Sequence, residues 1–142
     1  MEPVNLVALI DDDELVNFIA TKVIESTHLV KKIKSFSNGQ QAIDFLKTHL
    51  DRPDLIPEII LLDLNMPVMD GFQFLEEYIK LEPKLGKTIA VYVISSSISQ
   101  IDSDRIKQIS EVSDFIFKPI TKEKFENIVR ALKENSVKST SF

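Results

Sequence analysis

The sequence feature that most constrains this chain is an apolar run of strand length, Ile59 to Leu62, that ends at the carboxylate of Asp63. An uninterrupted apolar run is typical of a strand that is buried on both faces of a parallel sheet. Open sheets of this kind bind ligands beyond the carboxyl ends of their strands. The segment after Asp63 predicts a shaped loop, because Pro67 disfavours helical geometry before it and Asp70-Gly71 is a turn signal. Asp63 is therefore the first candidate for a functional residue.

Four other short apolar runs are predicted to be strands: Leu6 to Ile10, Leu29 to Phe36, Ile89 to Ile94 and Phe115 to Phe117. Each of the five strands is followed by apolar residues at helical spacing. This alternation implies a parallel sheet with right-handed crossovers and helices on both faces. Three lysines mark the strand at 29–36 as an edge strand: Lys31, Lys32 and Lys34.

The helix starts and the end of the domain are also indicated by the sequence. Asp13, Ser99 and Thr121 have the character and place of N-cap residues, and Asp70 and Gln73 are spaced as a capping pair. After Asn135 the helical period is lost. We therefore expect one domain over residues 1–136 and a flexible tail over residues 137–142.

Composition supports a single globular domain and excludes several classes of protein. The 142 residues are 44% hydrophobic and 27% charged, which are globular averages. The formal net charge of -5 argues against broad contact with nucleic acid phosphates. The chain has no cysteine, which excludes disulfides, thiolate metal sites and cysteine nucleophiles. The amino terminus lacks a signal-peptide pattern and no apolar run reaches membrane-spanning length, so we expect a cytoplasmic protein without membrane insertion.

Nine consecutive residues, Asp63 to Gly71, resemble the phosphoacceptor segment of bacterial response-regulator receiver domains of the CheY-like type. In that family an aspartate that ends the third strand is followed by two residues, Met-Pro, one more residue and Met-Asp-Gly, and every position of the pattern matches here. The resemblance implies a flavodoxin-like, doubly wound (βα)5 α/β fold with a five-stranded parallel sheet in the order 2-1-3-4-5. The strand pattern alone does not fix this order.

The resemblance also implies a Mg²⁺ site. If the first and third strands are neighbours, the acidic run after the first strand and the carboxylate of Asp63 share one edge of the sheet, and such oxygen ligands suit a hard divalent ion. In the family the two acids after the first strand serve the metal, and they correspond to Asp11 and Asp12. The backbone carbonyl of Asn65 completes the protein ligands implied for the metal, together with Asp63. The third acid, Asp13, is interpreted as a helix cap.

Two further residues match functional positions of the family. Lys118 ends the fifth strand and resembles the lysine that pairs with phosphoryl oxygens, whose bond to the following proline, here Pro119, is cis. Ser95 resembles the switch Ser/Thr, a hydroxyl that moves toward the phosphoryl group. Ser96 leaves a register ambiguity, and Ser95 is preferred because it directly follows the last apolar strand residue, Ile94.

The function implied by the resemblance is that of a two-component response regulator in a phosphorelay. Asp63 is expected to accept a phosphoryl group from a sensor histidine kinase or a histidine phosphotransfer protein, and the aspartyl phosphate is expected to shift the domain between two surface states. Such a domain assists its own phosphorylation and dephosphorylation but is not otherwise an enzyme. Since no output domain follows in this sequence, the signal is expected to leave by protein contact, either to a downstream target or to another histidine in a relay.

We expect the partner, or a second copy of the chain, to bind a face made by the fourth helix, the fifth strand and the last helix, around Arg105, Ile106, Phe115, Lys122 and Phe125. Strand alternation directs Phe115 and Phe117 to the same side, and Phe117 is expected to be a buried core residue. Relatives often have Gly-Ala just before this strand where this chain has Glu111-Val112-Ser113, which leaves the local loop shape open.

Two alternatives are weighed against the receiver interpretation. The first is an Asp-nucleophile phosphatase of the haloacid-dehalogenase type, which Asp11 and Asp13 fit superficially, although the Gly/Thr continuation and the cap insertion of that group are absent. The second is a receiver-shaped scaffold that does not use its phosphorylation site. The intact acidic pair, together with Asp63, Ser95 and Lys118, argues against it.

Overall fold

A computed structural model describes residues 3–140 of the chain, and within its last helix the side chains up to residue 134. The five strands are β1 (Val4–Ile10), β2 (Val30–Phe36), β3 (Ile59–Asp63), β4 (Ala90–Ser95) and β5 (Val112–Phe117). The five α-helices alternate with them and are α1 (Glu14–Ser26), α2 (Gly39–Thr48), α3 (Gly71–Leu81), α4 (Gln100–Lys107) and α5 (Lys122–Thr140). Two short 3-10 turns lie at Pro53–Leu55 and Glu82–Lys84.

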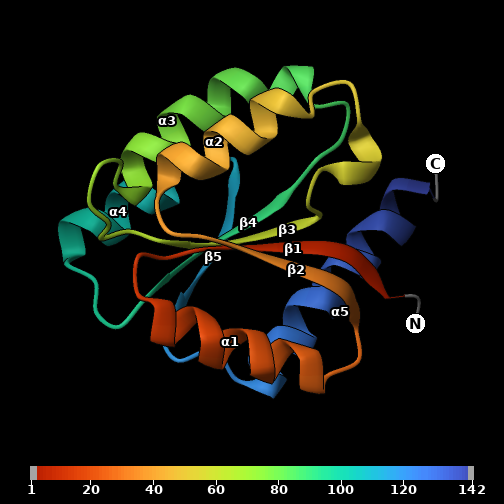
Figure 1. The fold of residues 1–142 in the computed structure, drawn as a ribbon, viewed down its shortest axis with the longest axis horizontal. Coiled ribbons are helices and arrows are strands. Elements are labelled where there is room, and N and C mark those ends of the chain that lie inside the picture. The colour runs from red at the N-terminus through yellow and green to blue at the C-terminus, as the bar shows by residue number, and fades with distance from the viewer. Residues whose placement is uncertain (1–2, 141–142) are drawn as a thin grey trace.

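The strands form one parallel sheet in the order β2-β1-β3-β4-β5, which confirms the predicted flavodoxin-like α/β fold. Helices α2, α3 and α4 cover one face of the sheet, and α1 and α5 cover the other (Figure 1). Successive residues of β1 alternate between the two cores: Ala8 and Ile10 pack under α2 and α3, whereas Val7 and Leu9 pack over α1 and α5. The edge position predicted for β2 is confirmed.

The predicted helix caps are confirmed. The Asp13 carboxylate accepts hydrogen bonds from the first-turn N–H groups of α1, and Ser99 caps α4 in the same way. Asp70 and Gln73 form a complete capping box at the start of α3. The Thr121 hydroxyl accepts a hydrogen bond from the N–H of Lys124 at 3.2 Å, which starts α5. Local sequence signals therefore set where these helices begin.

Strand β5 differs from its prediction in length and in burial. It begins at Val112, three residues before Phe115, and its register with β4 shifts so that Ser113 is an extra residue. The prediction that Phe117 is a core residue is wrong, because its side chain is 55% exposed. Phe117 packs edge-on against Phe115, with ring centroids 4.8 Å apart, on the same side of the strand. A strand at the edge of the sheet is less completely covered than the central strands, and this leaves the outer ring in solvent.

Helix α5 continues beyond the point at which the sequence pattern ends. Its backbone is helical as far as Thr140 and thus includes residues 137–140, where the pattern predicts a tail. Residues 141–142 lie outside the described residues. The buried face that anchors α5 to the sheet is made by Phe125, Ile128 and Val129, so the packed part of the helix precedes this extension.

Candidate functional site

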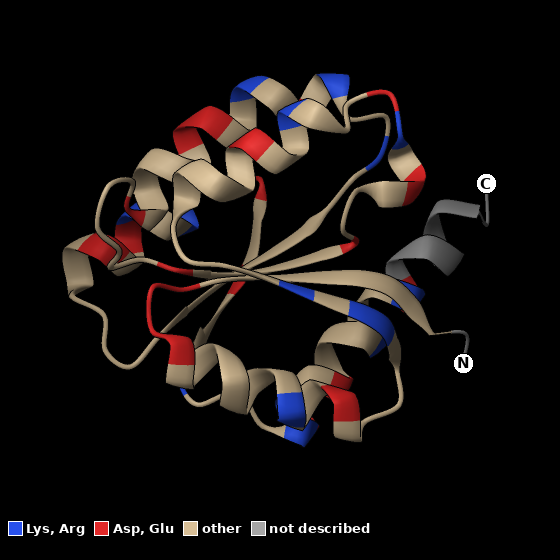
Figure 2. Cartoon of the chain, in the orientation of Figure 1, with Lys and Arg blue, Asp and Glu red and all other residues tan. Residues whose placement is uncertain are grey.

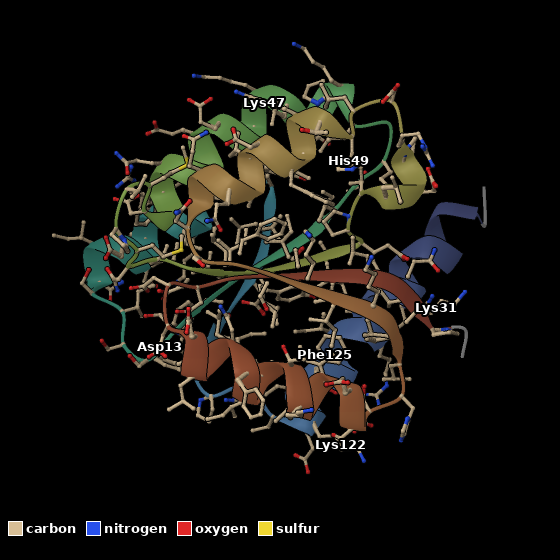
Figure 3. The ribbon with its side chains drawn as sticks, in the orientation of Figure 1. Asp13, Lys31, Lys47, His49, Lys122 and Phe125 are labelled. Atoms are coloured by element: carbon tan, nitrogen blue, oxygen red, sulfur yellow. The ribbon has the colours of Figure 1, made fainter. Side chains whose placement is uncertain are left out.

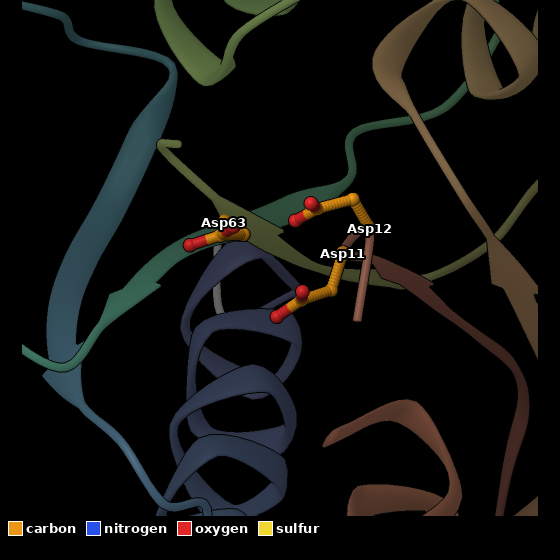
Figure 4. A group of neighbouring side chains, drawn as sticks. All are labelled: Asp11, Asp12 and Asp63. Carbon is orange, nitrogen blue, oxygen red and sulfur yellow. The ribbon is translucent and has the colours of Figure 1, made fainter. Parts of the chain in front are cut away.

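The carboxyl ends of β1 and β3 bring three acidic side chains together. Ile10 of β1 is paired with Leu62 of β3, so Asp11 and Asp63 follow at the same edge of the sheet. Oxygen atoms of Asp11, Asp12 and Asp63 lie within 4.8 Å of one another (Figure 4). Asp11 and Asp63 are each only 5% exposed, whereas Asp12 is exposed. The predicted acidic cluster is therefore present, and its hard oxygen ligands fit a divalent cation such as Mg²⁺.

Lys118 completes this cluster from the end of β5. Its Nζ lies 2.7 Å from an Asp11 carboxylate oxygen and 3.3 Å from an Asp63 carboxylate oxygen. The backbone N–H of Lys118 donates to the carbonyl of Ser95 at 2.8 Å, and the bond between Lys118 and Pro119 is cis, as the resemblance implies. The lysine thus bridges two carboxylates while its main chain is tied to the end of β4.

The buried Asp63 carboxyl and the partly buried Lys118 ammonium shift each other's pKa. Burial raises the pKa of the Asp63 carboxyl, and the nearby Asp11 raises it further, although Lys118 and a backbone hydrogen bond from Asn65 oppose both effects. Burial lowers the pKa of the Lys118 ammonium, but Asp11 and Asp63 outweigh burial, so that this pKa is raised overall. Lys118 therefore carries a positive charge at neutral pH, which partly neutralises the negative charge of Asp11 and Asp63.

Asp11 is held by neighbours from α1. One of its carboxylate oxygens accepts a hydrogen bond from the N–H of Asp13 at 2.9 Å, and its backbone carbonyl accepts one from the side-chain amide of Asn17 at 2.9 Å. Asn17 is buried on the inner face of α1, and this role is not visible in the sequence, where Asn17 is an ordinary polar helix residue. Asp13 lies at the start of α1, where it caps the helix (Figure 3).

The loop after Asp63 is closely packed at Gly71. A Cβ at Gly71 would lie 2.8 Å from the carbonyl oxygen of Asp63 and 2.7 Å from the Cα of Leu64, so any side chain there would displace the segment that ends β3. The Gly71 N–H donates to the carbonyl of Leu64 at 2.9 Å. Between them, Val68 has a φ of 70°, a left-handed conformation that β-branched residues rarely adopt. The predicted shaped loop is therefore confirmed.

Ser95 lies at the carboxyl end of β4, directly after the residue paired with Asp63. It is 2% exposed, and its hydroxyl donates to the backbone carbonyl of Ser97 at 2.7 Å. Ser96, the other candidate for the switch residue, is exposed. The Ser95 hydroxyl is thus occupied by its own loop in the structure.

The expected partner face includes two residues that the structure buries. Ile106 and Phe125 are buried in the two cores, 5% and 0% exposed. The Arg105 guanidinium stacks 3.9 Å from the ring centroid of Phe72 and therefore faces α3. Ile106 and Phe125 therefore do not belong to an exposed face, because the helical pattern marks an apolar stripe that here meets the sheet. Arg105 is exposed, with 53% of its side chain accessible, and its place on the partner face stays a prediction. Lys122 is exposed, and beside the partly buried Phe115 a cavity is lined by Ile98, Ser103, Ile106, Lys107, Val112, Ser113 and Asp114.

A second surface lies on the other layer, next to the acidic cluster. Three large apolar side chains of α1 are exposed: Leu15 at 66%, Phe18 at 59% and Ile19 at 47%. Ile19 also lines a cavity of about 120 Å³ that extends under α1 to Asp11 and Lys118. Figure 2 shows acidic residues in the segment that leads into α1 and basic residues along β2. Because Ile19 and Asp11 line the same cavity, apolar surface of α1 lies close to the acidic cluster.

The fold and this site together define the class of CheY-like receiver domains, and comparison with known proteins agrees. The family model of the response regulator receiver domain matches residues 7–130. A two-component response regulator from Cytophaga hutchinsonii has a similar structure, with a TM-score of 0.86, 28% identity, and 94% of this chain and 99% of that chain covered. A response regulator receiver protein from Dyadobacter fermentans gives a TM-score of 0.76 at 26% identity, with 90% and 97% covered.

Among curated sequences, the chain is 27% identical over 129 residues to "Probable methanogenesis regulatory protein FilR2" of Methanothrix harundinacea, which covers 91% of this chain and 81% of that protein. It is 35% identical over 119 residues to a protein-glutamate methylesterase/protein-glutamine glutaminase of Treponema pallidum, and there it spans 82% of this chain but 27% of that protein.

The chain belongs to the response regulator receiver domain family. The comparisons do not support the dehalogenase-like alternative. No helix within residues 3–140 combines the length and the apolar character needed to cross a membrane.

Proposed function

We propose that this receiver domain takes a phosphoryl group onto Asp63 from a phosphohistidine of a sensor kinase or a histidine phosphotransfer protein. The observation that carries the proposal is the meeting of Asp63 with Asp11, Asp12 and Lys118 at one edge of the sheet. A carboxylate oxygen of Asp63 attacks phosphorus, the bond from phosphorus to the histidine nitrogen breaks, and the imidazole leaves. The transfer requires positioning and charge neutralisation more than covalent help.

The residues that would hold Mg²⁺ are Asp11, Asp12, Asp63 and the backbone carbonyl of Asn65. When bound, the ion neutralises the crowded carboxylates and the phosphoryl oxygens. Lys118, which follows β5, supplies the second positive charge. Its contact with Asp63 at 3.3 Å is the longer of its two ion pairs, and we propose that it is exchanged for a pair with a phosphoryl oxygen.

The conformational response is proposed to start at Ser95. Its hydroxyl leaves the carbonyl of Ser97 and donates to a phosphoryl oxygen, which draws the loop before α4 toward Asp63. The space behind Ser95 is then open to the Phe115 ring, which has no hydroxyl to bury. The α4-β5-α5 side, with Phe115, Phe117 and Lys122 in place of the residues that proved buried, is proposed to contact a downstream protein or a second copy.

The α1 surface is proposed to receive the protein phosphodonor. Leu15, Phe18 and Ile19 expose apolar area beside the carboxylates that the donor's phosphohistidine must reach. A donor that packs on α1 places its histidine near Asp63 and leaves the α4-β5-α5 side free. Input and output would then use different elements of the fold.

The direct test is labelling by acetyl phosphate with Mg²⁺, which needs no protein donor. We expect one phosphoryl group per chain, on Asp63, found by intact mass and by peptide mapping. Asp63→Asn should abolish the label, and chelation of Mg²⁺ should suppress it. Asp51→Asn, which removes an exposed acid far along the sequence from the cluster, is the matched control and should label normally. Equal labelling of wild type and Asp63→Asn would overturn the proposal.

A further inference from the structure

Lys124 is placed where a lysine does not favour its own helix. Thr121 caps α5 by accepting a hydrogen bond from the N–H of Lys124, which makes Lys124 the third residue of the helix. A Glu or Gln at that position completes a capping box, and the helix dipole favours an acidic group in the first turn. A cation there weakens the start of the helix. In the structure, the Lys124 ammonium forms its hydrogen bonds with a segment outside the helix.

The contact is with the loop that carries Lys118. The Nζ of Lys124 donates to the backbone carbonyl of Phe117 at 2.7 Å and to that of Pro119 at 3.1 Å. These two carbonyls stand on either side of Lys118 in the sequence. Hydrogen bonds from a charged donor are stronger than those between neutral groups. The Lys124 ammonium group therefore holds the backbone on both sides of Lys118.

A third bond holds Lys118 from the other direction. Its own N–H donates to the carbonyl of Ser95 at 2.8 Å, toward β4. The carbonyl of Phe117 faces the open edge of the sheet, where β5 has no neighbouring strand, and Pro119 has no N–H to donate. Within the described residues, Lys124 is thus the side chain that closes the outer side of this loop.

We propose that Lys124 is a positioning residue for Lys118, an inference that rests on the proposed function. Lys118 reaches Asp11 and Asp63 through a long side chain with many rotamers, so the place of its ammonium depends on a fixed backbone. Lys124 supplies that fixed point from α5 without touching the acidic cluster. Lys124 thereby couples the first turn of α5 to the position of Lys118 in the acidic cluster.

The first test measures the backbone alone, without metal or phosphoryl donor. In Lys124→Met, which keeps the apolar stem and removes the ammonium, we expect the Lys118 amide to exchange with deuterium about tenfold faster, because local opening becomes easier. Lys122→Met removes the same charge from an exposed neighbour and is the matched control, with unchanged exchange. Lys124→Arg retains donors and should exchange close to wild type. Unchanged exchange in Lys124→Met would overturn the proposal.

The second test asks whether the effect passes through Lys118. Beryllium fluoride with Mg²⁺ is used as a mimic of the aspartyl phosphate, and its affinity is measured by calorimetry. Lys124→Met should bind it about tenfold more weakly, a loss typical of removing a group that orients a functional side chain. In a Lys118→Ala background the same change should have no further effect.

The outcomes separate the two proposals. A loss of affinity that is equal in both backgrounds would assign Lys124 a general structural role and overturn the inference. Failure of the wild-type chain to bind beryllium fluoride and to be labelled on Asp63 would instead contradict the proposed function.

Discussion

At the scale of single residues, Asp63 combines a chemical task with a cost in stability. It is buried beside another buried carboxylate, and one lysine serves both. Two carboxylates that share one cation leave negative charge in a partly desolvated place. The same crowding attracts a divalent cation, so the energetic weakness of the cluster and its capacity to bind metal have one origin.

The pH dependence of stability follows from the raised pKa of Asp63. The folded chain keeps the proton of Asp63 to a higher pH than the unfolded chain does. This residue therefore destabilises the fold progressively as the pH rises above the pKa of an unfolded aspartate, and fully above its folded pKa. With a chelator present, we expect Asp63→Asn to melt at a higher temperature than wild type at pH 7. The difference should shrink as the pH falls toward the pKa of an unfolded aspartate. Calorimetry measures it, Asp51→Asn is the control, and a lower melting temperature for Asp63→Asn at pH 7 would contradict the expectation.

The main residues of the site could be predicted because each lies at the end of a strand. Asp11, Asp63, Ser95 and Lys118 follow apolar runs, and parallel topology brings those ends to one edge. The roles of Asn17 and Lys124 could not be predicted in this way. Their contacts are hydrogen bonds to backbone carbonyls of other segments, which depend on the folded loop and leave no spacing in the sequence.

At the scale of elements, the start of α3 packs closely against the end of β3 through Gly71. We expect Gly71→Ala to lower the free energy of unfolding by about 2 kcal/mol, because its Cβ meets backbone atoms that cannot move aside, and to slow labelling of Asp63. Gly39→Ala is the comparison, since its Cβ meets the flexible side chain of Met69 at 3.0 Å and comes no closer than 3.2 Å to a backbone atom, the carbonyl oxygen of Met69. Urea unfolding measures both variants, and equal losses would show that the contact at Asp63 is not special.

Helix α4 is the most lightly held helix on its face. It has eight residues, Ile106 is its one buried side chain, and Ile101 is 79% exposed. Arg105 adds a tie to α3 through its stacking on Phe72, and its Nη2 lies 3.9 Å from a carboxylate oxygen of Glu76. Elements with little buried apolar area open most easily, which suits a helix proposed to respond to phosphorylation.

Removing the tie should loosen α4 without disturbing the site. In Arg105→Ala we expect amides of α4 to exchange roughly threefold to tenfold faster, as befits a cation–π contact worth about 1 kcal/mol. Asp63 labelling by acetyl phosphate should continue. Lys107→Ala, on the same helix but not stacked on α3, serves as the control. If α4 exchanges at the same rate in Arg105→Ala and wild type, the stacking does not hold the helix.

The sequence predicted the number, order and type of the main elements, and it missed where an element depends on its neighbours. The predicted strand began three residues after the start of β5, because Ser113 and Asp114 are exposed on an edge strand and interrupt the apolar pattern. For the same reason Phe117 resembles a core residue in the sequence while its ring lies in solvent. The spacing of apolar residues reflects which positions are buried. It therefore does not predict the bounds of a strand that is only partly buried.

At the scale of the whole molecule, the two proposed surfaces lie on different elements, one on α1 and the other on the α4-β5-α5 side. The exposed apolar residues Leu15, Phe18 and Ile19 belong to α1. Helix α4 lies on the opposite face of the sheet from α1, whereas α5 lies on the same face as α1 (Figure 1). This arrangement lets a donor and a target approach the same domain from different sides.

The separation can be tested with one variant on each surface. We expect Phe18→Ser to slow phosphotransfer from autophosphorylated kinases of the source genome by about tenfold, as loss of an aromatic anchor does, and to leave labelling by acetyl phosphate unchanged. Phe117→Ser should leave both rates unchanged. Rapid-mixing phosphotransfer assays give the rates. Slower transfer in Phe117→Ser with a normal rate in Phe18→Ser would reverse the assignment of the two surfaces.

The bonds made by the outer side of β5 have a consequence for how copies of this chain can meet. At that edge Lys124 covers the carbonyl of Phe117, and the Asp114 carboxylate accepts the N–H of Phe115 at 2.7 Å. The opposite edge, β2, carries the three lysines Lys31, Lys32 and Lys34. A strand of another copy that approached β5 would find the carbonyl of Phe117 and the N–H of Phe115 already hydrogen-bonded. Two β2 edges would repel each other through their lysines. The sheet is therefore guarded against edge-to-edge aggregation, and association is left to side chains and helices.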